Sequence, residues 1–199
     1  MPEVRIVSLA EADPTRREEA KRSLGVPVVP SAEALLAIPE VEAVVISTPP
    51  ATHAPLMEAA ARAGKHIFCE KPLAISLAEA DEAIAIAREK DVRLTVDFVL
   101  RQNPLNQRVG DLLRSGVLGP LLHMSLENCA TDEALKPGHW FWDASVSGGI
   151  WVEHGVHFFD LFTKLSGQTP ESVQASSTAR PDGCLDRVWA LVTYSHGLK

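Results

Sequence analysis

Hydrophobic and polar positions follow two different patterns along the chain, and the first pattern covers residues 1–99. Short apolar runs with β-branched residues lie at residues 4–9, 26–29, 41–47, 65–69 and 92–98. Segments of helical periodicity separate these runs, and some carry end signals, such as the Ser76-x-x-Glu79 capping box. Strands that alternate with helices pair in parallel through right-handed crossovers. We therefore expect residues 1–99 to form an α/β domain with a doubly wound parallel sheet.

After residue 99, strands no longer alternate regularly with helices. Helical periodicity marks residues 105–115 and 150–165, and alternating strands are predicted at 121–127, 173–178 and 187–194. The segment 131–149 has the composition of a loop. Alternation with one polar face is typical of antiparallel sheets. The sequence thus predicts an α+β domain at residues 100–199, with a mainly antiparallel sheet that we expect to be incomplete at its C-terminal end.

Charge, cysteine content and the absence of long apolar runs limit which binding partners and which cellular compartment we expect. The formal charge is −7 without a basic run, which argues against nucleic acid as the main partner. The three cysteines are widely spaced and fit neither a disulfide framework nor a Cys-rich metal site, so we expect a reducing cytoplasm. The first residues lack the profile of a signal peptide, and no apolar run has the length that spans a bilayer. We therefore expect neither secretion nor membrane insertion.

The segment around Lys71 is the main candidate for chemistry. Glu70 and Lys71 directly follow a predicted buried strand, and Pro72 keeps Lys71 out of a helix. Open α/β sheets bind ligands beyond the carboxyl ends of their strands. We interpret the Lys71 ammonium as part of a redox site at such an end. The alternative is a solvated Glu-Lys pair in a turn.

An acidic residue at the end of the first predicted strand bears on cofactor choice. A carboxylate at the position of Glu11 can hold the ribose hydroxyls of a dinucleotide, and it favours NAD over NADP because it repels a 2′-phosphate. The alternative is a residue that only starts a helix. The glycine-rich turn G-x-G-x-x-G does not occur in the sequence. Either the first β-α unit is missing, or the chain does not bind a dinucleotide in the usual way.

The predicted helix at residues 150–165 carries a second candidate pair. Glu153 and His157 are spaced i,i+4 and share one helix face, whereas His154 is expected to project elsewhere. A carboxylate beside an imidazole stabilises its protonated form, which suits His157 for proton transfer. A surface ion pair or a core histidine are the alternatives. A metal site of Glu153, His154 and His157 lacks the H-E-x-x-H order, so we predict no metal.

Several further motifs occur with these candidates. They are Glu11-Ala12-Asp13-Pro14-Thr15-Arg16, Ser47-Thr48-Pro49 with His53, Gly64-Lys65-His66 leading to Cys69-Glu70-Lys71-Pro72, Arg101 with Asn103-Pro104, and Gly148-Gly149 followed by Glu153, Gly155, His157 and Asp160. Together they resemble the glucose-fructose oxidoreductase/inositol dehydrogenase (Gfo/Idh/MocA) family of nicotinamide-dependent sugar oxidoreductases. The resemblance covers nearly the whole chain.

The resemblance implies hydride transfer between NAD, or else NADP, and a hydroxyl or carbonyl carbon of a sugar, a polyol or a related small molecule. It implies that Lys71 lies beside the nicotinamide and the substrate hydroxyl, and that His157, with Glu153, is the acid/base group. The residues that it places along the cofactor cleft are Thr48, Pro49, His53, Glu70, Lys71 and Pro72. It also implies a Rossmann-like dinucleotide-binding domain at 1–99, a substrate and oligomerisation domain at 100–199, and a homodimer or homotetramer.

The sequence departs from the family pattern at one candidate site residue. The family usually has Asp at the position of Glu153, and Glu lengthens the carboxylate arm. The glycine-rich start is also absent. These departures leave open the alternative of a non-catalytic or truncated family member that keeps the fold without cofactor turnover.

Overall fold

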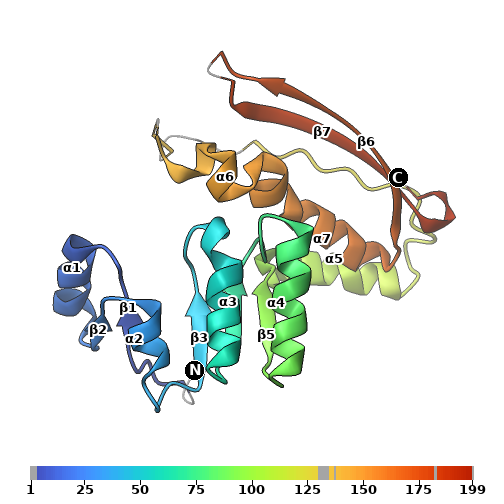
Figure 1. Ribbon diagram of the computed structural model, residues 1–199. Coiled ribbons are helices and arrows are strands. Elements are labelled where there is room, and N and C mark those ends of the chain that lie inside the picture. The colour runs from blue at the N-terminus through green and yellow to red at the C-terminus, as the bar shows by residue number, and fades with distance from the viewer. Residues whose placement is uncertain (1–3, 130–134, 137, 182, 199) are drawn as a thin grey trace. The chain divides into compact units, whose positions relative to one another are not determined.

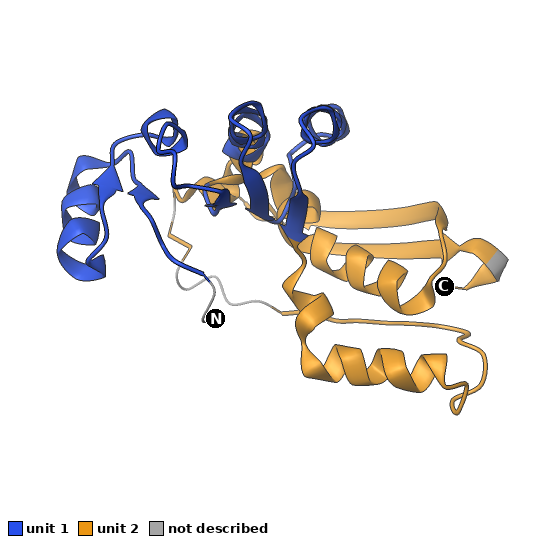
Figure 2. Ribbon diagram, turned by 90° about the horizontal axis from the view of Figure 1, so that it is seen from below, with its two compact units in different colours: residues 1–48, 52–96 blue, residues 49–51, 97–199 orange. Residues whose placement is uncertain are grey.

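The chain forms two compact units in a computed structural model that describes residues 4–129, 135–136, 138–181 and 183–198. Unit 1 contains residues 1–48 and 52–96, and unit 2 contains residues 49–51 and 97–199 (Figure 2). No described helix is long and apolar enough to cross a membrane.

Unit 1 alternates strands with helices, as the sequence predicts (Figure 1). Its elements are β1 (Leu9–Ala10), α1 (Pro14–Leu24), β2 (Val28–Val29), α2 (Ala32–Leu36), β3 (Ala43–Ile46), α3 (His53–Arg62), β4 (His66–Glu70), α4 (Leu77–Glu89) and β5 (Leu94–Asp97). β1 pairs in parallel with β2, and a second sheet has the order β3-β4-β5. β3 and β4 are parallel, with Ile46 opposite Cys69. The predicted parallel sheet is thus confirmed.

Local signals explain where the helices of unit 1 begin and end. The Asp13 carboxylate accepts a hydrogen bond from the Arg16 backbone nitrogen at 2.8 Å, and Pro14 opens α1. Gly25 ends the same helix at a φ of 65°, where a Cβ would be disfavoured. At α4 the Ser76 hydroxyl accepts from the Glu79 backbone nitrogen at 3.3 Å. This bond is one half of the predicted capping box.

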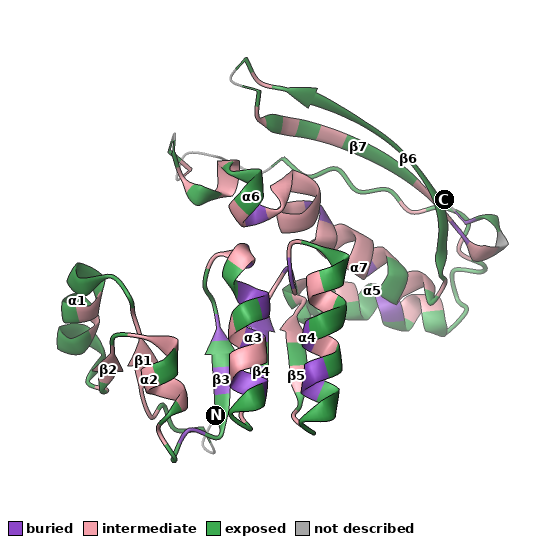
Figure 3. Ribbon diagram, viewed as in Figure 1, coloured by how far each residue is buried: buried purple, intermediate pink, exposed green. Residues whose placement is uncertain are grey.

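The core of unit 1 lies between α3, α4 and one face of the sheet (Figure 3). Residues alternate along β3 and β4, so that Val44, Ile46, Ile67 and Cys69 are buried while Val45 is 73 % exposed. The sequence predicts a buried strand before Lys71, and β4 is buried on one face only, since Phe68 on the other face is 40 % exposed. An apolar run fits a strand with both faces covered, but only one face of β3 and β4 is buried here.

Unit 2 combines helices with an antiparallel strand pair. Its elements are a 3₁₀ turn (Val99–Gln102), α5 (Pro104–Arg114), a second 3₁₀ turn (Trp140–Trp142), α6 (Ala144–Ser147), a π-helical turn (Trp151–Gly155), α7 (Val156–Ser166), β6 (Pro170–Ala179) and β7 (Leu185–Tyr194). β6 and β7 pair antiparallel, with Ala175 opposite Ala190. The α+β class and the antiparallel sheet are therefore confirmed.

Three expectations about local structure are wrong. Residues 121–127 alternate like a strand but have no regular secondary structure, because a strand needs a ladder partner and none of the described strands pairs with them. The predicted strand at 4–9 is reduced to β1. The predicted loop at 131–149 contains α6 and a 3₁₀ turn, although residues 130–134 and 137 lie outside the described part.

Candidate active site

The carboxyl ends of β3 and β4 lie at the same edge of the sheet. The two strands are parallel and in register from Ala43 opposite His66 to Ile46 opposite Cys69. The segments that follow them, residues 47–52 and 71–73, therefore leave the sheet side by side. This edge is where open α/β sheets bind ligands. Lys71, half-buried, lies directly after β4, and its peptide bond to Pro72 is cis.

The His53 imidazole joins the two segments. Its Nδ1 atom lies 2.7 Å from the carbonyl oxygen of Pro72, and its Nε2 atom lies 2.8 Å from the carbonyl oxygen of Thr48. The residue is only 1 % exposed. Both ring nitrogens lie within hydrogen-bond distance of a backbone carbonyl oxygen, and a neutral imidazole, which carries one N–H, donates to one of the two. The histidine thereby holds the backbone on the C-terminal side of Lys71.

Hydroxyl groups lie exposed near this edge. The Oγ1 atoms of Thr48 and Thr52 are 2.6 Å apart, and both residues are exposed. Such hydroxyls can donate to and accept from a polar ligand. Pro49 lies between them in the sequence and is half-buried.

Glu11 lies directly after β1, as the sequence predicts for a strand-end carboxylate. Its Oε1 atom accepts a hydrogen bond from the Asp13 backbone nitrogen at 2.9 Å, and its carbonyl oxygen accepts from Arg17 Nη1 at 2.8 Å. The first contact is the one expected of a helix-start residue. It also fixes the carboxylate at the carboxyl end of β1.

Cys69 at the end of β4 is a core residue. Its side chain is fully buried, and burial raises the pKa of the thiol to about 12, with a smaller contribution from the negative charge of Glu70. A thiol of this kind stays protonated near neutral pH and is a poor nucleophile. We therefore assign Cys69 no part in the chemistry.

The predicted helix at residues 150–165 is present, but it begins with the π-helical turn. Glu153 Oε2 lies 4.0 Å from His154 Nδ1, and Asn128 Nδ2 donates to His154 Nε2 at 3.0 Å. The expectation that His154 projects away from this group is wrong. A π turn bonds i to i+5, which shifts the side-chain positions that an α-helix would give.

His157 lies close to this group. The rings of His154 and His157 are nearly perpendicular, at 84°, with centroids 6.3 Å apart. The Glu153 side chain is only 12 % exposed. The described residues contain no group of three or more His, Cys, Asp or Glu side chains that could hold a metal ion. The arrangement supplies two imidazoles and a carboxylate for proton transfer within unit 2.

Arg101 and Asp160, two motif residues without a predicted contact, form an ion pair in unit 2. The Arg101 Nε atom donates to Asp160 Oδ2 at 2.7 Å, and Nη2 donates to Oδ1. The hydrogen bonds to Asp160 raise the pKa of the Arg101 guanidinium, although its partial burial lowers it. The guanidinium also lies 5.5 Å from the centre of the Phe98 ring. The pair joins the turn after β5 to α7.

Sequence reasoning found neither the Arg101–Asp160 pair nor the contact between Asn128 and His154. The partners are 59 and 26 positions apart, and no local pattern links positions so distant. The only signal was that Arg101 and Asp160 both belong to motifs of the family.

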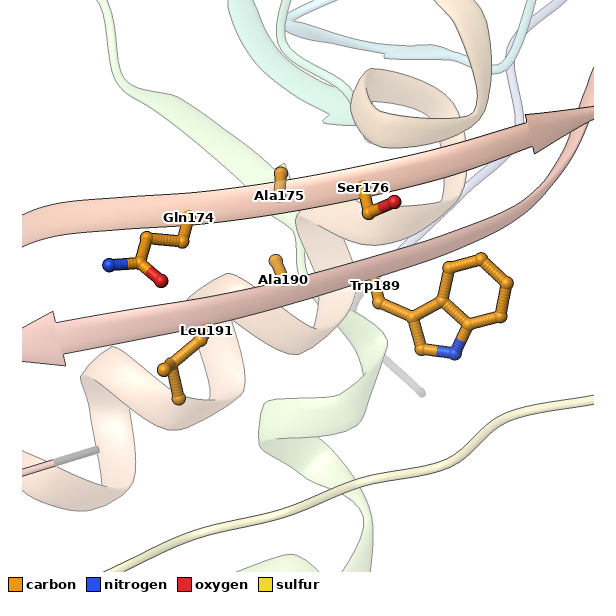
Figure 4. A pocket seen from close by; sticks show the side chains of 6 residues that line it. All are labelled: Gln174, Ala175, Ser176, Trp189, Ala190 and Leu191. Carbon is orange, nitrogen blue, oxygen red and sulfur yellow. The ribbon is translucent and has the colours of Figure 1, made fainter.

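A shallow cavity of about 410 Å³ lies on the β6–β7 pair (Figure 4). Its lining residues are Gln174, Ala175, Ser176, Trp189, Ala190 and Leu191. None of the predicted site residues lines it. This cavity is therefore a feature of the strand pair and is separate from the candidate chemistry.

Comparison with known proteins defines the class. Residues 1–98 match the family described as "Oxidoreductase family, NAD-binding Rossmann fold", and residues 106–199 match the "GFO/IDH/MocA C-terminal domain". The chain therefore belongs to the Gfo/Idh/MocA oxidoreductase family, which confirms the assignment made from its motifs.

Individual relatives agree with this assignment. An inositol 2-dehydrogenase of Rhizobium meliloti is 31% identical over 180 residues, which are 90% of this chain and 53% of the relative. The structure of a putative myo-inositol dehydrogenase from Sinorhizobium meliloti 1021 is 30% identical with a TM-score of 0.83, covering 97% of this chain and 59% of that one. The WlbA dehydrogenase of Bordetella pertussis, in complex with NADH and UDP-GlcNAcA, is 25% identical with a TM-score of 0.87 over 97% and 57% of the two chains. This chain spans about half the length of the curated relatives that it matches.

Proposed function

We propose that this chain acts in an NAD-dependent oxidoreductase that transfers a hydride between the nicotinamide and a hydroxyl-bearing or carbonyl carbon of a sugar or polyol. The observation that carries the proposal is the position of Lys71 at the carboxyl edge of β3 and β4, where His53 holds the following residue. The relative that acts on inositol supports a polyol substrate. NADP stays a second choice of cofactor.

The residues present fit part of the cofactor. The carboxylate of Glu11, fixed by the Asp13 backbone nitrogen, suits the ribose hydroxyls of NAD. Thr48, Pro49, Glu70 and Lys71 belong to the segments at the edge of β3 and β4 and suit its nicotinamide end. The sequence contains no G-x-G-x-x-G turn for the pyrophosphate.

Each catalytic group has a separate role in the proposal. When bound, NAD supplies the hydride acceptor at its nicotinamide ring. The Lys71 ammonium holds the substrate oxygen and stabilises the negative charge that develops on it. The His157 imidazole takes the proton of the substrate hydroxyl. Glu153 stabilises the imidazolium that results, since a neighbouring carboxylate favours the charged form.

The test uses a deuterium label to detect hydride transfer and a substitution of His157 to detect proton transfer. The enzyme is incubated with NAD and a panel of inositols and sugars deuterated at the reacting carbon, and the deuterium content of the NADH is measured. We expect deuterium in the NADH, and we expect His157→Asn to lower kcat most strongly at neutral pH. NADH that forms without deuterium would contradict hydride transfer.

A non-catalytic family member is the second candidate, since Glu153 stands where the family usually has Asp. Titration of the purified chain with NADH, followed by a turnover assay, separates the two. Binding without turnover of any substrate in the panel would favour the second candidate.

We also propose a homo-oligomer, either a dimer or a tetramer, and a cytoplasmic location. Val173 and Trp189 on the β6–β7 pair are 62 % and 58 % exposed, which is typical of a surface that another chain covers. Cys69 and Cys129 are free thiols, as is usual in a reducing compartment. Light scattering of the purified protein tests the first point, and fractionation of the source cells tests the second.

A further inference from the structure

We propose that His53 is a positioning residue that fixes Lys71, and that it does not contact the cofactor. This inference rests on the role proposed above for Lys71. The family resemblance places His53 along the cofactor cleft. Its geometry supports a different role, because the residue is 1 % exposed and both ring nitrogens face backbone carbonyl oxygens of the chain itself.

The two carbonyl groups show what the histidine holds. Pro72 follows Lys71 directly, and Glu70, directly before Lys71, is the last residue of β4. The backbone of Lys71 is therefore fixed on one side by the sheet and on the other by the imidazole. The second ring nitrogen lies against Thr48, which follows β3. One side chain thus sets the spacing between the segments that leave the two strands.

The packing around His53 makes this connection rigid. His53 begins α3, and the buried residues Ala54 and Met57 of the same helix belong to the core of unit 1. The ring is thus anchored to a close-packed helix and cannot move without disturbing it. A displacement of about 1 Å at a catalytic group can cost about 10²-fold in rate. Small movements of the Lys71 backbone would therefore lower turnover.

Two substitutions separate the two contacts. The Asn amide nitrogen overlaps the position of Nδ1, so His53→Asn keeps the contact with Pro72 and loses that with Thr48. The Gln amide nitrogen reaches the position of Nε2, so His53→Gln keeps the contact with Thr48 and loses that with Pro72. His123→Gln is the matched control, because His123 is exposed.

Hydrogen exchange tests the contact without any need for activity. We expect faster deuterium uptake in residues 70–76 of His53→Gln, and faster uptake in residues 47–52 of His53→Asn. His123→Gln should match the wild type in both segments. Equal uptake in all four proteins would overturn the proposal. Should both variants fail to fold, NMR of the wild type decides: a slowly exchanging ring N–H of His53 with a cross-peak to residues 72–73 supports it, and a rapidly exchanging ring overturns it.

Kinetics test whether His53 acts through Lys71. We expect His53→Gln to lower kcat by about 10²-fold with the Kd for NADH unchanged, and His53→Asn to lower it less. In the double variant with Lys71→Ala, turnover should fall no further than in Lys71→Ala alone. Additive losses, or a raised Kd with normal kcat, would overturn the positioning role. Normal turnover in Lys71→Ala would refute the function proposed for Lys71 and with it this role, while hydrogen exchange would still report whether the contact exists.

Discussion

Arg101 and Asp160 form a two-point ion pair that connects the turn after β5 to α7 across 59 positions of sequence. The Asp160 side chain is 9 % exposed and the Arg101 side chain 41 %. Paired hydrogen bonds between a guanidinium and a carboxylate are geometrically specific. The pair therefore fixes the start of unit 2 against the helix that carries His157.

Removal of this guanidinium should destabilise the protein. In Arg101→Ala the Asp160 carboxylate stays largely buried without its partner, which leaves a desolvated charge. Because Arg101 is partly exposed, we expect a loss of about 1–2 kcal/mol in the free energy of unfolding. Urea unfolding measures it. The control is Arg114→Ala, whose pair with Asp111 is exposed on both sides and should cost less than about 0.5 kcal/mol. An equal or larger loss in the control would contradict this account.

Stability should fall at alkaline pH because of Cys69. Burial raises the pKa of its thiol to about 12 from the ordinary value of 9.0. The folded chain then holds a proton that the unfolded chain releases above pH 9.0, so the stabilisation is complete below that pH and is lost as the pH rises toward about 12. The limiting slope is about 1.4 kcal/mol per pH unit for one group.

The measurement is urea unfolding at several pH values between about 8 and 10, a range that spans the onset of the decline at the ordinary thiol pKa of 9.0. We expect Cys69→Ala to lose part of the alkaline decline, whereas Cys129→Ala, which alters an exposed thiol, should keep it. Identical slopes for the wild type and Cys69→Ala would show that the thiol is not responsible.

His154 should be held in one tautomer. The Asn128 amide donates to Nε2, so the proton of the neutral ring belongs on Nδ1, which faces Glu153. Two-dimensional ¹⁵N NMR of the ring nitrogens distinguishes the tautomers. We expect the Nδ1–H form in the wild type and a mixture in Asn128→Ala. A wild-type ring protonated mainly on Nε2 would contradict the arrangement.

Local sequence signals predicted the framework of unit 1. The cap at Ser76 lies where the sequence places it, because a cap needs only neighbouring residues. The parallel pairing of β3 with β4 followed from strands that alternate with helices. These features depend on short-range geometry and on simple topological rules.

Features that depend on distant partners were not predictable from the pattern. In residues 121–127 apolar and polar side chains alternate as they do in a strand, but none of the described strands pairs with this segment. The π-helical turn brings His154 beside Glu153, whereas α-helical spacing directed it away. The position of His53 likewise depends on carbonyl groups in two segments, one of them 19 positions away. The sequence could identify the candidate residues, but their contacts required the folded chain.

The most direct test of the proposed function is the turnover of Lys71→Ala. Loss of one group that stabilises developing charge typically lowers kcat by about 10²–10³-fold. We expect a loss of that size, with the Kd for NADH and the melting temperature unchanged. Lys90→Ala is the control, because Lys90 ends α4 and pairs with Glu89 on the surface. Wild-type turnover in Lys71→Ala would contradict the proposal.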